Sequence, residues 1–209
     1  MSSYFFKIKY KMKKFQALLF LVLIAFSCTN NKEKVLVSVD DQQHPNLILT
    51  TKSVAEIKTQ LGSIPLFDET LAVAKQEVDA AIETGIDVPV PKDMAGGYTH
   101  TQHKLNYANM QKAGVLFQLL GDEKYAIYIR DMLLEYAKIF PTFKTHPEPR
   151  SYATGKFFWQ CLNDSNWLTY TSQAYDCIYS WLPKEQSEYL NKNLFRPYAD
   201  FLSVENPKY

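Results

Sequence analysis

The sequence predicts an all-α fold, and three observations point to it. Apolar residues recur three and four positions apart along most of the chain, which is the spacing of amphipathic helices. Glycine and proline account for 7 and 10 of the 209 residues and fall mostly between these stretches, where they end helices. No convincing series of strand-like segments is present. We therefore expect helices joined by turns and loops.

Two helices are expected first. Residues 51–62 predict a short helix with Ser53 as its N-cap and Gly62 as its stop. Asp68 is expected to cap a second helix over residues 69–83, whose apolar side chains share one face and leave the charges on the other. This apolar face requires a partner helix.

A long loop and two further helices follow. Residues 84–100 contain prolines and glycines that oppose regular structure, and long ordered loops are often functional. A helix is predicted from about Lys104 to Leu120, ended by Gly121. Asp122 opens the next helix, which together with its predecessor forms a helical hairpin.

The hairpin is predicted to end at Phe140, before Pro141. A proline-rich loop then leads into a helix from about residue 156 to residue 181, and Pro183 starts the last helix. Antiparallel helix pairs with alternating short and long connections build either α/α toroids or helical repeat arrays. The hairpins share no residue pattern at a fixed period, which favours an incomplete α/α toroid.

The N-terminus predicts an export signal over residues 1–27, with Met12 as the expected start. Two lysines precede an unbroken apolar stretch, and Cys28 follows a small residue as in the cleavage box of bacterial lipoproteins. We expect Cys28 to be lipidated and residues 28–43 to form a polar tether to the membrane. Ordinary secretion is the alternative, whereas a retained transmembrane helix is disfavoured because the apolar run is short. The expected location is the periplasm or the outer membrane.

The folded domain is expected to span residues 44–209. Loss of residues 1–27 would remove five lysines and no acids, which changes the net charge from +1 to −4. This charge disfavours a nucleic-acid partner. Cys161 and Cys177 would lie in one helix, about 24 Å apart, so they cannot form a disulfide with each other. We expect both to be buried free thiols.

Residues 96–107 concentrate polar and aromatic side chains where a loop enters a helix, including Tyr98, His100 and His103. A structural interpretation is also open, in which a histidine caps the helix, the tyrosines pack and Lys104 is solvated. Zinc binding is disfavoured, because the two histidines, three residues apart at a helix start, have no evident carboxylate or cysteine as a further zinc ligand. We expect neither a metal nor another cofactor.

A second polar segment, residues 149–176, places Gln160, Asn163 or Asp164, and Trp167 on one face of the predicted helix. An unsatisfied buried polar group costs about 1–3 kcal/mol, so these side chains either form an internal network or line a cleft. Amides beside aromatic rings suit sugars, whereas plain packing is the alternative for the four aromatic residues of residues 157–167. Positive charge for an acidic sugar would come from Lys104, Arg150, Lys156 and the two histidines.

The blocks GGYTHTQHKLNY, GVLFQLLGDEKYAIYIRDMLLEYAKIFP, SYATGKFFWQCLNDSNWLTYTSQAYDCIYSWL and NLFRPYADFLSVENP closely resemble the N-terminal helical domain of the oligoalginate lyases. The likeness covers nearly all of residues 44–207. It implies an all-α domain built as an incomplete α/α toroid, as in chondroitin AC and alginate lyases, followed in the family by a β-sandwich domain of the heparinase II/III type.

The resemblance further implies an exported lyase that cleaves uronate-containing oligosaccharides by β-elimination, with alginate oligomers as the acidic substrate. In this family an Asn-His pair neutralises the substrate carboxylate and a tyrosine moves the proton. No Asn-His dipeptide occurs in the chain. We therefore expect these catalytic residues beyond Tyr209 and assign none to this chain. By their positions in the matching blocks, the substrate-binding candidates are Tyr98, His100, His103, Lys156, Gln160 and Asn163.

Two other functions are compatible with parts of the sequence. A noncatalytic, surface-anchored, glycan-binding helical lipoprotein would share the lipidation signal and the aromatic residues, but it would leave the four lyase-like blocks unexplained. A structural or partner-binding helical module would have an exposed apolar face and no affinity for sugars.

Overall fold

The computed structural model describes residues 43–148 and 153–206. All regular structure in these ranges is helical, so the predicted all-α class is confirmed. The α-helices are α2 (Thr51–Gln60), α3 (Pro65–Thr84), α4 (Tyr98–Leu120), α5 (Glu123–Ile139), α6 (Cys161–Ile178), α7 (Lys184–Leu190) and α8 (Arg196–Asp200). The predicted signal peptide, Cys28, the tether up to residue 42 and Arg150 lie outside the described residues.

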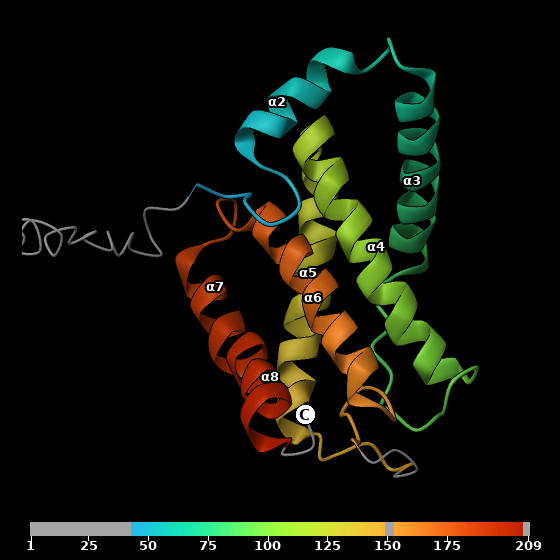
Figure 1. Ribbon diagram of the computed structural model, residues 1–209, viewed down its shortest axis with the longest axis vertical. Helices are drawn as coiled ribbons and strands as arrows, with labels where there is room; N and C mark the ends of the chain where they lie inside the picture. Colours follow the sequence, from blue (N-terminus) through green and yellow to red (C-terminus); the bar gives the residue numbers. More distant parts are fainter. Residues whose placement is uncertain (1–42, 149–152, 207–209) are drawn as a thin grey trace, which may run out of the picture. The chain divides into compact units, whose positions relative to one another are not determined.

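Successive helices from α3 to α7 alternate in direction, so that α4 and α6 run one way and α3, α5 and α7 run the other (Figure 1). Helix α4 packs against α2, α3, α5 and, most extensively, α6. Helix α5 contacts α4, α6 and α7. The parallel pair of α4 and α6 is therefore central to the packing of these residues.

Helices α4 and α6 begin at other residues than the apolar pattern predicts. Helix α4 begins at Tyr98 rather than near Lys104, because the Asp93 carboxylate accepts a hydrogen bond from the Thr99 backbone N–H at 2.9 Å. The intervening Gly97 fits against this carboxyl group, since a Cβ atom there would lie 2.3 Å from the Asp93 Cβ. A side chain of the preceding loop thus caps the helix from outside it.

Helix α6 begins at Cys161, and the predicted start near Lys156 is wrong. The backbone N–H groups of residues 156–158 donate to the Asp164 carboxylate, so they make no helical hydrogen bonds. Gln160 is consequently the N-cap residue of α6 and does not continue the helical face of Asn163 and Trp167. A carboxylate six to eight residues further along the chain has overridden the local helical pattern.

The remaining helix boundaries follow local capping. Thr50 caps α2 and forms a capping box with Ser53, so the predicted N-cap Ser53 is the third residue of the helix. The prediction that Asp68 caps α3 is wrong, because this helix begins earlier, at Pro65, with Ile64 as its N-cap residue. Asp68 lies in the first turn instead, where its carboxylate accepts from the Gly62 backbone N–H at 2.8 Å. Asp122 caps α5 as predicted, by accepting from the Lys124 backbone N–H at 3.1 Å.

The last helical segment begins at Lys184 after Pro183, as predicted. It continues through a π-helical stretch (Asn191–Phe195), α8 and a second π-helical stretch (Phe201–Glu205). A turn of π-helix holds about one residue more than a turn of α-helix. The side chains that follow therefore face other neighbours than they would in an uninterrupted α-helix of the same sequence.

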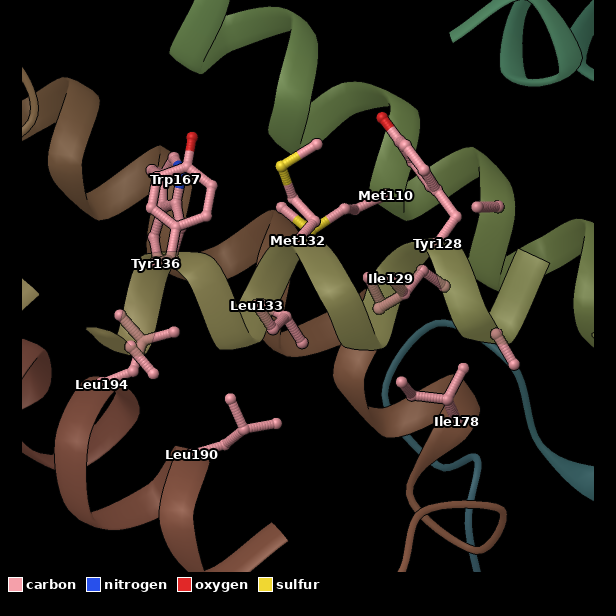
Figure 2. Close-up of a cluster of buried hydrophobic side chains, with 14 of the residues drawn as sticks. Met110, Tyr128, Ile129, Met132, Leu133, Tyr136, Trp167, Ile178, Leu190 and Leu194 are labelled. Atoms are coloured by element: carbon pink, nitrogen blue, oxygen red, sulfur yellow. The ribbon is translucent and has the colours of Figure 1, made fainter. Parts of the chain in front are cut away.

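The core lies where α4, α5, α6 and the α7–α8 segment meet. Figure 2 shows side chains from α4, α5, α6 and the last helical segment gathered around the axis of α5. The labelled members of this cluster are Met110, Tyr128, Ile129, Met132, Leu133, Tyr136, Trp167, Ile178, Leu190 and Leu194. Removal of this apolar area from water is the main stabilising contribution to the fold.

The first described residues are anchored at the C-terminal end of α6. His44 Nδ1 lies 2.5 Å from a carboxylate oxygen of Asp176, whose other oxygen accepts from the backbone N–H groups of Asn46 and Leu47 at 2.7 and 2.8 Å. The side chain of Asp176 is only 4 % exposed, so these donors satisfy a buried carboxylate.

Helices α4 and α6 approach closely at Gly114. A Cβ atom on this residue would lie 3.0 Å from the Cys177 Cβ and 3.4 Å from the Ala174 Cα. A glycine here lets the two backbones come together, and a larger side chain would have to push them apart.

We predict that Gly114→Val destabilises the chain by about 2 kcal/mol through overpacking of the α4–α6 contact. Chemical denaturation followed by circular dichroism measures this loss. Ala72→Val, on the exposed side of α3, is the matched control for the helix propensity of valine and should cost well under half as much. Equal losses in the two variants would contradict the assigned contact.

Candidate functional site

The segment before α6 is organised by the buried carboxylate of Asp164. This residue is 0 % exposed and accepts hydrogen bonds from the backbone N–H groups of Lys156, Phe157 and Phe158 at 2.9, 3.0 and 3.3 Å. The Tyr198 hydroxyl of α8 donates a short hydrogen bond to the same carboxylate. Asp164 therefore belongs to an internal network, one of the two arrangements that the sequence left open.

Burial is the dominant electrostatic influence on Asp164. It raises the pKa of the carboxyl group to about 7, although the Tyr198 hydroxyl and the three backbone donors each favour the charged form. The space around the carboxylate is filled, because a Cβ atom on Gly155 would lie 1.8 Å from Asp164 Oδ2. Asp164 thus fixes the path of the chain into α6.

His103 lies in the core. Its side chain is 0 % exposed, its ring stacks on Phe157 with centroids 5.2 Å apart, and its Nδ1 lies 2.8 Å from the Tyr136 hydroxyl. Asn106 donates to the same hydroxyl at 3.0 Å and to the Asp87 backbone carbonyl at 2.7 Å. Burial lowers the pKa of His103 to about 3, so the ring is neutral at physiological pH. This environment connects α4, α5 and the loop before α4.

His100 lies one turn earlier on α4 and is also buried, with 4 % of its surface exposed. Its ring meets the edge of Phe158 at a centroid distance of 5.1 Å. Burial lowers the pKa of His100, and the nearby positive charge of Lys104 adds to this effect. The two histidines and the Phe157-Phe158 pair bring the start of α4 and the segment before α6 together.

Lys156 presents a positive charge beside these residues. Its ammonium nitrogen lies 4.4 Å from the ring centroid of Phe140 and 5.1 Å from that of Phe201. Within the described ranges, no carboxylate forms an ion pair with this ammonium group. Lys156 lines a small cavity of about 210 Å³ together with Lys144 and His146. Val90 and Pro91, from the loop before α4, line the same cavity. A cation held on aromatic rings without an acidic partner is suited to an anionic ligand.

The other candidates lie at the same end of the two helices. Tyr98 is the first residue of α4, is 59 % exposed and donates its hydroxyl hydrogen to the Asp87 carboxylate. Gln160 is the N-cap of α6 and makes no capping hydrogen bond through its side chain, and both it and Asn163 are half-buried. The predicted candidates thus gather at one end of the molecule, with His103 closed off from solvent.

The aromatic residues before and within α6 divide between the core and the surface. Phe157, Phe158 and Trp167 are buried, and Trp167 packs against Tyr136 and Tyr198 at centroid distances of 4.7 and 5.3 Å. Plain packing, one of the two interpretations from the sequence, is therefore confirmed for these three residues. Trp159 is half-buried.

Cys161 and Cys177 are free and buried, as predicted. Burial raises the pKa of both thiols, that of Cys177 to about 12, so neither is a ready nucleophile. The described ranges contain no group of three or more His, Cys, Asp or Glu side chains arranged for a metal ion. Nor do they contain a helix long and apolar enough to cross a membrane.

Two curated proteins match most of the chain. An exo-oligoalginate lyase of Saccharophagus degradans is 44 % identical over 170 residues, which cover 81 % of this chain and 23 % of that protein. An alginate lyase of Stenotrophomonas maltophilia is 41 % identical over 162 residues, which cover 78 % and 22 %. The resemblance to the oligoalginate lyases is confirmed.

The two alignments cover most of this chain but less than a quarter of each relative. This chain therefore spans less than a quarter of the length of the curated relatives that it matches. No protein-family model matches the chain.

We predict that Gly155→Ala destabilises the chain by about 3 kcal/mol, because the new methyl group would displace the Asp164 carboxylate from its donors. Thermal and denaturant unfolding measure the loss. Gly62→Ala is the control, since nothing lies within 4 Å of the Gly62 Cβ position, although Gly62, unlike Gly155, has a positive φ of 80°. The control should lose only about 1 kcal/mol from backbone strain. A Gly155 variant as stable as the control would refute the role given to Asp164.

A second prediction concerns acid stability. His103 takes up a proton at about pH 6.5 when unfolded but only at about pH 3 when folded. Its contribution to stability is therefore complete above pH 6.5 and is lost as the pH falls toward 3, at up to about 1.4 kcal/mol per pH unit.

Protonation of Asp164 changes the free energy of unfolding in the opposite direction over part of the same pH range, because burial raises its pKa to about 7. Comparison with the variant His103→Gln therefore isolates the contribution of His103. The unfolding free energy of the unaltered chain should fall more steeply with acidification than that of the variant. Parallel pH profiles would show that His103 titrates normally in the folded state.

Proposed function

We propose that the chain is the N-terminal part of a polysaccharide lyase that cleaves uronate-containing oligosaccharides, with alginate oligomers as substrate. The single observation that carries this proposal is the 44 % identity over 81 % of the chain to an exo-oligoalginate lyase. The second relative, named an alginate lyase, supports the same class of carbon–oxygen lyase.

The proposed reaction is β-elimination. The C5 proton of a uronate is removed, the electron pair forms the C4–C5 double bond, and the glycosidic oxygen at C4 leaves with the rest of the sugar chain. The proton is weakly acidic until the adjacent carboxylate is neutralised by hydrogen-bond donors or positive charge. By the family resemblance, the Asn-His pair and the tyrosine that perform these steps lie beyond Tyr209, and this chain supplies substrate-binding residues.

The fold supports a place for this chain in an α/α toroid. The parallel neighbours α4 and α6 would form part of one layer, and the oppositely directed α3, α5 and α7 part of the other. Such a two-layered arrangement of alternating helices is how helical hairpins build toroids and solenoids. We propose the toroid on this arrangement together with the absence of a fixed sequence repeat.

The substrate would contact the end of the molecule where α4 and α6 begin. Lys156 offers an unpaired ammonium group for a uronate carboxylate, and Gln160 and Asn163 offer amides for sugar hydroxyls. Tyr98 offers an exposed ring. His100 and His103 would support this surface from beneath, because both are buried against Phe158.

The N-terminal sequence supports a proposal about location. Residues 12–28 combine lysines, an apolar run and a cysteine after a small residue, which is typical of an exported lipoprotein. We propose that the mature chain is anchored through a lipid on Cys28 in the periplasm or outer membrane, where it would meet alginate oligomers that enter from outside.

The proposed function is tested by joining residues 44–209 of this chain to the remaining C-terminal part of the Saccharophagus relative. The joined protein should release unsaturated uronate from alginate oligomers, measured by the ultraviolet absorbance of the new double bond, whereas this chain alone should release none. Lys156→Gln in the joined protein should raise KM about tenfold, because a charge-assisted contact worth about 1.4 kcal/mol is lost.

The matched control is Lys192→Gln, an exposed lysine on the last helical segment, which should leave KM unchanged. A folded joined protein without lyase activity would contradict the proposal. Sugar binding by this chain, without activity in the joined protein, would favour the noncatalytic glycan-binding lipoprotein.

A further inference from the structure

The face that α4 and α6 share carries polar and aromatic residues away from the proposed substrate-binding end. Lys104, Tyr107 and Gln111 lie three and four residues apart on α4, and Asn166, Tyr170 and Gln173 lie at the same spacings on α6. These six residues are here called the seam face. All are exposed or half-buried, so the seam face is accessible along the parallel pair of helices seen in Figure 1.

Side chains of the two helices pair across the seam face. The rings of Tyr107 and Tyr170 have centroids 5.0 Å apart and planes tilted by 30°. Further along, the Gln111 amide nitrogen donates to the Gln173 amide oxygen at 2.5 Å. The Gln111 oxygen and the Gln173 nitrogen have no hydrogen-bond partner in the described part of the chain. The result is an aromatic platform followed by an acceptor and a donor that are free for a ligand.

The seam face also lacks negative charge, in contrast to the neighbouring helices. Helix α4 contains no Asp or Glu, and the two acids of α6, Asp164 and Asp176, are buried and hydrogen-bonded. By comparison, α3 carries five acidic residues. The exposed Lys104 therefore gives the seam face a positive character that complements an anionic ligand.

The seam face continues from the proposed substrate-binding end. His100 precedes Lys104 by one turn on α4, and Asn163 precedes Asn166 by one turn on α6. From His100 to Gln111 the helix rises by about 16 Å, which exceeds the size of one sugar ring. A ligand that begins at Lys156 and Gln160 would thus need several sugar units to reach Gln111 and Gln173.

From these observations we propose that the seam face is an additional binding site for acidic oligosaccharides, which holds the distal sugars of longer chains. Tyr107 and Tyr170 stack against the apolar side of a sugar ring, the two glutamines bind hydroxyl groups, and Lys104 attracts a uronate carboxylate. This inference rests on the proposed function for its ligand class. It goes beyond that function because it proposes that the six residues of the seam face, which lie outside the proposed substrate-binding end, make the chain bind longer oligomers more tightly than short ones.

The test is calorimetric titration of the full chain with an alginate dimer and an alginate hexamer. The unaltered chain should bind the hexamer more tightly than the dimer. Tyr170→Ala should weaken hexamer binding about tenfold, the effect of losing about 1.4 kcal/mol of ring contact, and leave dimer binding unchanged. Lys104→Gln should weaken hexamer binding and reduce its dependence on salt.

Tyr189→Ala is the matched control, because Tyr189 is similarly exposed, 42 % against 36 % for Tyr170, but lies on α7. It should bind both oligomers like the unaltered chain, and circular dichroism should show both tyrosine variants folded. A glucose hexamer, neutral and of equal length, should bind at least tenfold more weakly than the alginate hexamer.

Hexamer binding by Tyr170→Ala equal to that of Tyr189→Ala would overturn the seam face as a binding site. If Lys156→Gln then still weakened the binding of both oligomers, the proposed function would stand without it. An unaltered chain that binds neither oligomer would contradict both the seam face and the sugar-binding role of this chain.

Discussion

The carboxylate of Asp164 is the point on which the described structure most depends. Its donors come from the segment before α6 and from α8, so one buried group joins residues 34 positions apart in the chain. A buried carboxylate that loses its partners is costly, since the desolvation of the charge is no longer offset. This requirement fixes the turn at Gly155, the start of α6 and the rotation of the last helix together.

That single group also determines where the proposed substrate-binding residues lie. With the backbone N–H groups of residues 156–158 directed to Asp164, Phe157 and Phe158 point into the core against His103 and His100. Lys156 and Gln160, on either side of these phenylalanines, are left half-buried. The polar surface is thus supported by a rigid apolar layer, which limits the motion of side chains that would bind a sugar.

The sequence was sufficient for the helical class and for most helices, because their apolar spacing and local caps act over only a few residues. Asp122 and Pro183 marked helix starts through contacts within one turn. The starts of α4 and α6 were not predictable in this way, since Asp93 and Asp164 redirect backbone donors through contacts that a helical pattern does not contain.

The candidate site, like the helix boundaries, was predictable from the sequence only in part. The segments at residues 96–107 and 156–163 were recognisable by their density of polar and aromatic side chains, and they do lie at the same end of α4 and α6. The burial of His103 was not predictable, because it depends on Tyr136 and Phe157 from other elements. Part of the seam face was visible in the sequence, because Tyr107 and Gln111 are four residues apart and α4 contains no acidic residue. Their contacts with Tyr170 and Gln173 could not be predicted, because these contacts depend on how α4 packs against α6.

The π-helical stretch Asn191–Phe195 has a consequence for how this sequence can change in length. It accommodates an extra residue within a helix that otherwise has α geometry on both sides. Deleting one residue there would restore the α-helix while the later side chains keep their direction, because the wide turn has absorbed the extra residue. Tyr198 would then still face Asp164. The helix can therefore lose one residue at this stretch, whereas adding a further residue would turn Tyr198 away by about 100° around the helix axis.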